Sequence, residues 1–209
     1  LATSALDSYA SFEQLTGGVE TLFKDSGSTV ENYAQQAYTT AGMSANEYMD
    51  TITSFSASLI SSLGGDTAKA AEAGNQAVID MSDNANKMGT NIADIEHAYQ
   101  GFAKQNYTML DNLKLGYGGT KEEMERLLAD AEKLTGQHYD ISSFNDITEA
   151  IHAIQTEMGI TGTTAKEAAT TIEGSVNSMK GAYSNWLTSL GDENSDLGDS
   201  TQKLVDSII

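Results

Sequence analysis

Proline is absent from this sequence of 209 residues, although average usage of roughly 5% predicts about 10. Because proline interrupts helices, a long chain that lacks it and marks its turns with glycine favours an all-helical protein. Aromatic residues make up only 7% of the chain. Runs of Val, Ile and Thr that alternate with polar residues are also missing, so β-sheet is not expected.

Cysteine is absent too, which excludes disulfides and thiolate metal sites. Basic residues are few: 11 Lys and Arg stand against 30 Asp and Glu, and the net charge is −19. A surface this acidic repels phosphate backbones and anionic lipids, so nucleic-acid binding through a basic patch is not expected. No apolar run approaches the roughly 18 residues needed to span a bilayer.

The apolar residues that are present recur every three or four positions, which is typical of amphipathic helices. The longest series alternates steps of four and three from Ala165 to Leu190. Such stripes bury against partner helices, so the sequence predicts an all-α bundle of about seven to nine helices. The main predicted core positions are Ile52, Phe55, Leu59, Val78, Met81, Ile95, Phe102, Leu127, Ile151, Ile154, Ile172, Met179 and Trp186.

Helix ends are marked repeatedly along the chain. Ser or Thr followed three residues later by Glu predicts a capping box, in which each side chain accepts a backbone N–H at the helix start. The predicted boxes are Ser28/Glu31, Ser44/Glu47, Thr120/Glu123 and Thr164/Glu167. Further predicted N-caps are Asp66, Asn91 and Ser143. Predicted stops are the glycines that follow apolar series: Gly42, Gly64, Gly65, Gly89, Gly136, Gly159 and Gly191.

The ends of the chain differ from its middle. We expect a core helical domain over residues 28–190, a flanking helical segment over 1–27, and an acidic hinge leading into a further helix over 191–209. The sequence starts at Leu1 and ends within an apolar pattern at Ile208 and Ile209. It is therefore expected to be a segment of a longer protein.

A glycine-rich turn from Gly116 to Lys121 raises the question of a phosphate site. A P-loop needs a Gly-Lys pair after a strand, and a dinucleotide fingerprint would need glycine where Lys121 stands. We therefore predict a corner between helices, closed by Thr120 and Glu123, and regard an anion site as the disfavoured alternative. The glycines would let the Met124–Leu134 stripe fold back on the Ile92–Phe102 stripe.

Other chemical motifs are incomplete. The acidic stretch at 192–200 resembles half a calcium loop, but Leu197 stands where glycine is needed and Lys203 where a bidentate Glu is needed. Three histidines, His97, His138 and His152, lack metal-ligand spacing and are interpreted as boundary or surface residues. Glu122, Glu123 and Glu125 suit a solvated helix start. No catalytic residue, metal or cofactor is predicted.

Three stretches carry a further signal. The most specific runs from Asn106 to Thr120 and reads NYTMLDNLKLGYGGT; the others begin GMSANEYMDTITSF at 42 and YDISSFNDITEA at 139. Together, with their surroundings, they closely resemble the core region of phage tail tape measure proteins, the type common in tailed phages and prophages of Gram-positive bacteria. The signature and corner positions are Asn106, Tyr107, Asp111, Gly116, Gly118, Gly119, Thr120 and Glu123.

The resemblance implies a non-enzymatic virion part that occupies the lumen of the tail tube, sets tail length during assembly and assists genome delivery. It implies the tail tube protein, tail assembly chaperones, tail tip proteins and further copies of the same chain as partners. DNA would pass through the same channel without sequence-specific binding, and other parts of the full protein would contact the host envelope. The protein would lie in the virion, and in the host cytoplasm during assembly.

Two alternatives remain from different classes. The chain is a helical protein–protein interaction module of a surface or secreted protein, or it is a cell-wall hydrolase carried by a tail. The second is disfavoured because nothing in residues 1–209 resembles a peptidoglycan-cleaving domain.

Overall fold

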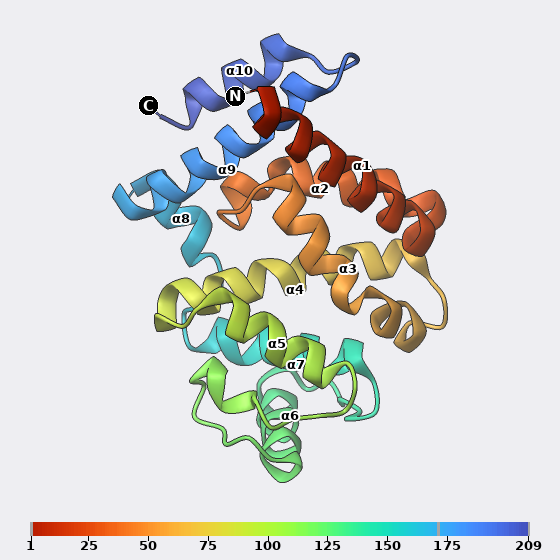
Figure 1. The fold of residues 1–209 in the computed structure, drawn as a ribbon. Helices are drawn as coiled ribbons and strands as arrows, with labels where there is room; N and C mark the ends of the chain where they lie inside the picture. The colour runs from red at the N-terminus through yellow and green to blue at the C-terminus, as the bar shows by residue number, and fades with distance from the viewer. Residues whose placement is uncertain (1, 171, 209) are drawn as a thin grey trace. The chain divides into compact units, whose positions relative to one another are not determined.

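The computed structural model describes residues 2–170 and 172–208, and these residues form helices and turns with no strand. The predicted all-α fold class is confirmed. The chain divides into two compact units, unit 1 (residues 1–53 and 164–209) and unit 2 (residues 54–163). Figure 1 traces the helices in chain order.

Unit 1 is made from both ends of the chain. Its elements are α1 (Ala2–Phe23), the short 3-10 helix η1 (Lys24–Ser26), α2 (Gly27–Thr40), the first part of α3 (Ala45–Ser62), α8 (Thr163–Thr170), α9 (Ile172–Gly191) and α10 (Leu197–Asp206). Helix α1 packs against α2 and α9, and α10 packs against α9. This division differs from the predicted segments 1–27, 28–190 and 191–209, because helical periodicity does not reveal which distant stripes pack together.

Unit 2 is continuous in sequence. Its elements are the rest of α3, α4 (Thr67–Met88), α5 (Ile92–Phe102), the 3-10 helix η2 (Leu110–Leu113), α6 (Lys121–Thr135) and α7 (Phe144–Glu157). Helix α4 packs against α5 and α7, whereas α6 packs chiefly against α7. The expected return of the Met124–Leu134 stripe onto the Ile92–Phe102 stripe is therefore wrong, since α7 is the main partner of α6.

Several predicted helix starts are confirmed. Ser44 and Glu47 form a reciprocal capping box: the Glu47 carboxylate accepts from Ser44 N at 2.7 Å, and Ser44 Oγ accepts from Glu47 N at 3.3 Å. The side chains of Asp66, Asn91 and Ser143 each cap a helix as predicted. These caps place the starts of α3, α4, α5 and α7.

Two predicted boxes are wrong. Ser28 lies inside α2, whose N-cap residue Ser26 has φ −91° and ψ 1° and makes no side-chain cap. The chain enters α2 directly from η1, so it never adopts the extended conformation that a capping residue needs. Thr164 likewise lies inside α8, which begins one residue earlier.

The predicted glycine stops all lie at helix ends. Gly89 and Gly136 end α4 and α6 in the left-handed conformation, with φ of 66° and 73°. Positive φ is also found at Gly42, Gly64, Gly65 and Gly159. Gly191 is the last residue of α9 but has no positive φ, and a Cβ there would lie 2.6 Å from the Cβ of Tyr9. Its role is close helix approach between α1 and α9.

Most predicted core residues are buried. The buried ones are Ile52, Phe55, Leu59, Val78, Met81, Ile95, Phe102, Leu127, Ile151 and Ile154. Met179 and Trp186 are only half-buried, which corrects the prediction for α9. That helix buries Ser178 and Ala182 instead. The side chain of Ile172 lies outside the described residues.

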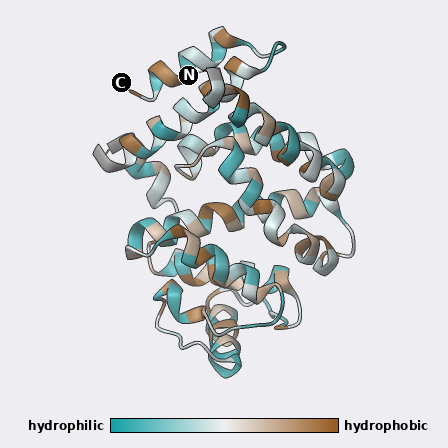
Figure 2. Cartoon of the chain, viewed as in Figure 1, coloured by the Kyte–Doolittle hydropathy of each residue, from teal (hydrophilic) through white to brown (hydrophobic). Residues whose placement is uncertain are grey.

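Apolar residues are distributed among many helices. In Figure 2 apolar and polar residues are interleaved along the helices. Among the helices that the structure describes, none is long and apolar enough to cross a membrane. The interleaving of apolar and polar residues fits helices that each bury one apolar stripe against a neighbouring helix.

Candidate functional site

The signature residues lie between α5 and α6 or in the first turn of α6, and we call residues 103–120 the signature loop. Asn106 Oδ1 accepts from the backbone N and the hydroxyl of Thr108, at 3.1 and 2.8 Å, and so fixes a local turn. Tyr107 is 6% exposed, and its hydroxyl donates to the carbonyl of Ile141 at 3.2 Å. Asp111 is exposed, within η2. The loop is therefore anchored through its aromatic residue.

One glycine of the loop is required by backbone contact. A Cβ at Gly119 would overlap the carbonyl oxygen of Thr108 and lie 2.9 Å from its carbonyl carbon. At Gly118 the nearest atom would be Glu123 Cγ at 3.5 Å, an ordinary contact. Gly116 has φ 88°, which suits glycine for a different reason. Two backbone segments thus touch at Gly119.

The predicted Thr120/Glu123 box is only half formed. Thr120 Oγ1 accepts from Glu123 N at 3.2 Å, as expected. The Glu123 carboxylate accepts from Gly118 N at 2.9 Å instead of from the N–H of Thr120, which donates to Gly118 O. The carboxylate therefore ties the loop to α6, whereas the Thr120 hydroxyl caps the helix start.

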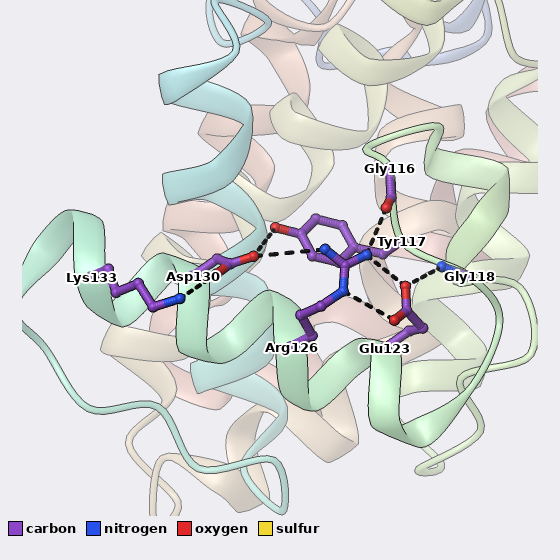
Figure 3. Close-up of polar contacts among 7 residues, drawn as sticks. All are labelled: Gly116, Tyr117, Gly118, Glu123, Arg126, Asp130 and Lys133. Carbon is purple, nitrogen blue, oxygen red and sulfur yellow. Dashed lines mark hydrogen bonds and ion pairs between the residues drawn. The ribbon is translucent and has the colours of Figure 1, made fainter.

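Arg126 completes this closure, as Figure 3 shows. Its guanidinium donates to Gly116 O at 2.7 Å and to Glu123 at 2.6 and 3.0 Å. It also lies 4.2 Å from the centroid of the Tyr117 ring, a cation–π contact. The hydroxyl of Tyr117 donates to Asp130, which Lys133 also contacts. Sequence reasoning missed Arg126, Tyr117 and Asp130, although the i, i+3 and i, i+4 spacing of Glu123, Arg126 and Asp130 on α6 was available.

These contacts use the donors that a phosphate would need. The N–H of Gly118 and the Arg126 guanidinium both bind Glu123, and Glu122 and Glu123 occupy the first turn of α6. An incoming anion would therefore meet a carboxylate. The loop is a connection between α5 and α6 that hydrogen bonds to Glu123 and Arg126 hold against α6.

The pKa of Glu123 provides a test of this arrangement. Hydrogen bonds from Arg126, and secondarily from Gly118 N, lower the pKa of Glu123 to about 2. We expect Arg126→Gln to raise this pKa but to leave it below the ordinary value, because the Gly118 bond remains. Carboxyl-carbon NMR titration measures it. As a matched control, Lys121→Gln removes the ion pair with Glu125 and should leave Glu123 unchanged.

A second candidate site is a cleft of about 680 Å³ in unit 2, formed by α4, α7 and the end of α6. We call it the α4–α7 cleft. Its volume lies within the range of small-molecule sites. Rim carboxylates come from Glu72, Glu149 and Glu157, and Leu134 adds exposed apolar surface.

Asp80 and His152 form a hydrogen-bonded pair in the wall of this cleft. His152 Nδ1 lies 2.9 and 3.0 Å from the two carboxylate oxygens of Asp80. The Asp80 side chain is 1% exposed and that of His152 is 36% exposed. Gln76 Nε2 also donates to Asp80, at 3.0 Å. The pair joins α4 to α7 at the edge of the core.

A buried polar chain continues behind the pair. Gln155 Nε2 donates to the carbonyl of Asp80 at 3.1 Å, and Asn84 Nδ2 donates to Gln155 Oε1 at 2.8 Å and to Leu113 O at 3.0 Å. Each bond satisfies a group that would be costly to bury alone. These bonds hold α4, α7 and η2 in fixed positions relative to one another.

The pair binds protons more tightly in the folded chain than in the unfolded one. The hydrogen bond to Asp80 raises the pKa of His152, and Asp83 and Glu149 add to this rise. Burial raises the pKa of Asp80 although its hydrogen bonds act in the opposite direction. Stabilisation by His152 is therefore complete below pH 6.5, its ordinary pKa, and is lost as the pH rises through the folded pKa.

NMR titration tests this directly. We expect the His152 imidazole to titrate above 6.5, and Asp80→Asn to bring the pKa down because the carboxylate partner is gone. The same substitution should flatten the fall in unfolding free energy above pH 6.5. An unchanged His152 titration in Asp80→Asn would contradict the assignment.

The contacts of His152 Nδ1 in this cleft are both to the Asp80 carboxylate. Across residues 2–170 and 172–208, no group of three or more acidic or histidine side chains could hold a metal ion. His152 is half-buried, as its predicted boundary position implies. Its partner lies 72 positions away, and no local spacing links the two.

Comparisons with other proteins add no assignment. No family model, curated protein or solved structure matches this chain.

Proposed function

We propose that this chain is a segment of a phage tail tape measure protein, a non-enzymatic component that occupies the tail lumen, sets tail length and assists genome delivery. The observation that supports the proposal is the block from Asn106 to Thr120, whose amino-acid sequence resembles that family. Within this block, Gly119 allows close backbone contact with Thr108, and Thr120 caps α6. The sequence of the block is therefore more specific than the composition of a helical protein alone would require. Its partners would be the tail tube protein, assembly chaperones, tail tip proteins and other copies.

Composition is compatible with this role. A helix rises about 1.5 Å per residue, so a long helical chain can act as a ruler. A net charge of −19 disfavours adhesion to DNA in a shared channel. The compact units described above would have to open for the chain to lie extended in a tube. Tight binding of this chain to duplex DNA at physiological salt would contradict the charge argument.

Tail length is the decisive measurement. In the phage or prophage that encodes the chain, an in-frame duplication of residues 54–163 adds 110 residues. A fully helical ruler would then lengthen the tail by about 165 Å. Electron microscopy of particles from the parent and the duplicated strain, prepared in parallel, gives both lengths. Tails of parental length would overturn the proposal.

The second candidate is a helical interaction module of a surface or secreted protein, and exposed apolar residues on α9 favour it. Cross-linking in assembled tails separates the two, because a tape measure segment should cross-link to the tube protein. A turbidity assay on cell walls tests the hydrolase alternative. We expect no clearing by this chain.

A further inference from the structure

The α4–α7 cleft combines an apolar wall with a charged rim. Leu63, Ala73 and Ala153 line it together with Tyr139. Tyr139 is 6% exposed, and its hydroxyl donates to Thr135 Oγ1 at 3.0 Å, so this side chain is fixed in the wall. All the lining residues belong to unit 2, so the cleft is complete within one compact unit. Its volume of about 680 Å³ suits a small organic molecule.

Three carboxylates on the rim have no basic partner. Glu72 lies on α4, Glu149 and Glu157 lie on α7, and all three are exposed. Within the part of the chain that the structure describes, none of the three forms an ion pair. Lys69 is the only Lys or Arg among the described lining residues, and it pairs with Asp66 at 3.6 Å. The rim is therefore left with uncompensated negative charge.

Glu149 is held in place by neutral donors. Gln137 Nε2 donates to one of its carboxylate oxygens and Asn145 Nδ2 to the other, both at 2.8 Å. Amide donors orient a carboxylate without cancelling its charge, unlike Arg126, which forms an ion pair with Glu123 on α6. Glu149 is therefore an oriented anionic group that a cation can meet without first displacing a base.

The Asp80–His152 pair adds a polar group to the wall without reversing the sign of the charge. A protonated imidazole beside an ionised carboxylate makes a neutral pair, so the rim carboxylates determine the charge of the cleft. Because His152 Nδ1 faces Asp80, Nε2 on the opposite side of the ring is the nitrogen that can meet a ligand.

These charges fit an organic cation better than a metal ion or an anion. Among residues 2–170 and 172–208, no group of three or more acidic or histidine side chains could hold a metal ion, so the carboxylates surround the cleft and do not converge on one ion. A phosphate or carboxylate ligand would be repelled by the rim. An ammonium or guanidinium group on an apolar body would instead match both the rim and the wall.

We propose that the α4–α7 cleft binds a small organic cation, an amine or guanidine whose charge lies among Glu72, Glu149 and Glu157 and whose apolar body lies against the wall. The charge of the rim identifies the class of ligand, and the volume of the cleft limits its size. This site does not depend on the tape measure proposal, which assigns no ligand to the chain.

Calorimetric titration of the 209-residue chain with naphthylmethylamine tests the proposal. Naphthylmethanol is the matched neutral probe, because it has the same aromatic body with a hydroxyl in place of the ammonium group. We expect the amine to bind about tenfold more tightly than the alcohol, and added NaCl to reduce this difference because salt screens the rim charges. No binding of the amine, or equal binding of the two probes, overturns the proposal.

Three variants locate the binding. Glu72→Gln/Glu157→Gln should weaken amine binding about tenfold and leave alcohol binding unchanged, because two rim charges are lost. Glu122→Gln/Asp94→Asn is the matched control: it removes two exposed carboxylates of unit 2 that do not line the cleft, and it should bind as the parent does. Ala73→Phe fills the cleft and should weaken binding of both probes. Circular dichroism confirms that each variant is folded, and the Glu72→Gln/Glu157→Gln result decides if Ala73→Phe is not. Unchanged amine binding in Glu72→Gln/Glu157→Gln, or in folded Ala73→Phe, overturns the proposal.

Discussion

Gly119→Ala is expected to lower the free energy of unfolding by about 3 kcal/mol. The added methyl group would overlap the carbonyl oxygen of Thr108, and the atom it meets is backbone, which cannot turn aside. Relief requires the two loop segments around Gly119 and Thr108 to move apart. Such a movement would disturb the neighbouring bonds of Gly118 and Glu123. Urea denaturation monitored by circular dichroism measures the change.

The adjacent glycine is the control for this substitution. Gly118→Ala adds the same methyl group one residue earlier, where its nearest neighbour is Glu123 Cγ at 3.5 Å. Neither glycine has a positive φ, so intrinsic backbone strain does not separate the two. We expect Gly118→Ala to cost less than about 1 kcal/mol. Equal losses in the two variants would show that the contact with Thr108 does not hold the loop.

His152→Leu is expected to lower the free energy of unfolding by about 2 kcal/mol at neutral pH. The substitution leaves Asp80 buried without its main counter-charge. This loss lies below the roughly 3–5 kcal/mol of a fully buried pair, because the His152 side chain is 36% exposed and partly screened by water. The loss should shrink in acid, where Asp80 becomes protonated and no buried charge remains. Denaturation curves at several pH values test both parts.

His138 supplies a matched control for this effect. Its Nδ1 lies 3.1 Å from a Glu132 carboxylate oxygen, nearly the same distance as in the buried pair, but its side chain is 81% exposed. We expect His138→Leu to change stability by less than about 0.5 kcal/mol. The double variant Asp80→Leu/His152→Leu should regain part of the loss, since it removes both charges. A double variant less stable than His152→Leu would contradict this account.

Local chemistry explains what could be predicted from the sequence. Asp66, Asn91 and Ser143 cap their helices because the capping bond spans only two or three residues. Most predicted core positions are buried because a helix has one preferred apolar face. The core prediction was wrong for α9, where a face of small residues and a face of large apolar residues could each be the buried one. Helix α9 uses its small residues for contact and exposes its larger stripe, a choice that depends on what α1 and α2 present.

The candidate sites show the same limit. The cap formed by the Thr120 hydroxyl could be predicted from the spacing of Thr120 and Glu123. The Glu123 carboxylate accepts from Gly118 N and not from Thr120 N, and this depends on the path of the loop. The Asp80–His152 pair joins residues far apart in the chain, so periodicity could not reveal it. Spacing alone also predicts a cap at Ser28, which the structure does not form because a 3-10 helix leads directly into α2.

The discontinuity of unit 1 has a consequence for folding order. Its two parts are separated by the 110 residues of unit 2, from 54 to 163. Contacts across so long a connection are reached late, because loop closure must precede them. On the ribosome, unit 2 can complete its local helix pairs while α9 is still being synthesised. Helix α1 can pack against α2 at once, whereas its contact with α9 forms only after unit 2 has been synthesised.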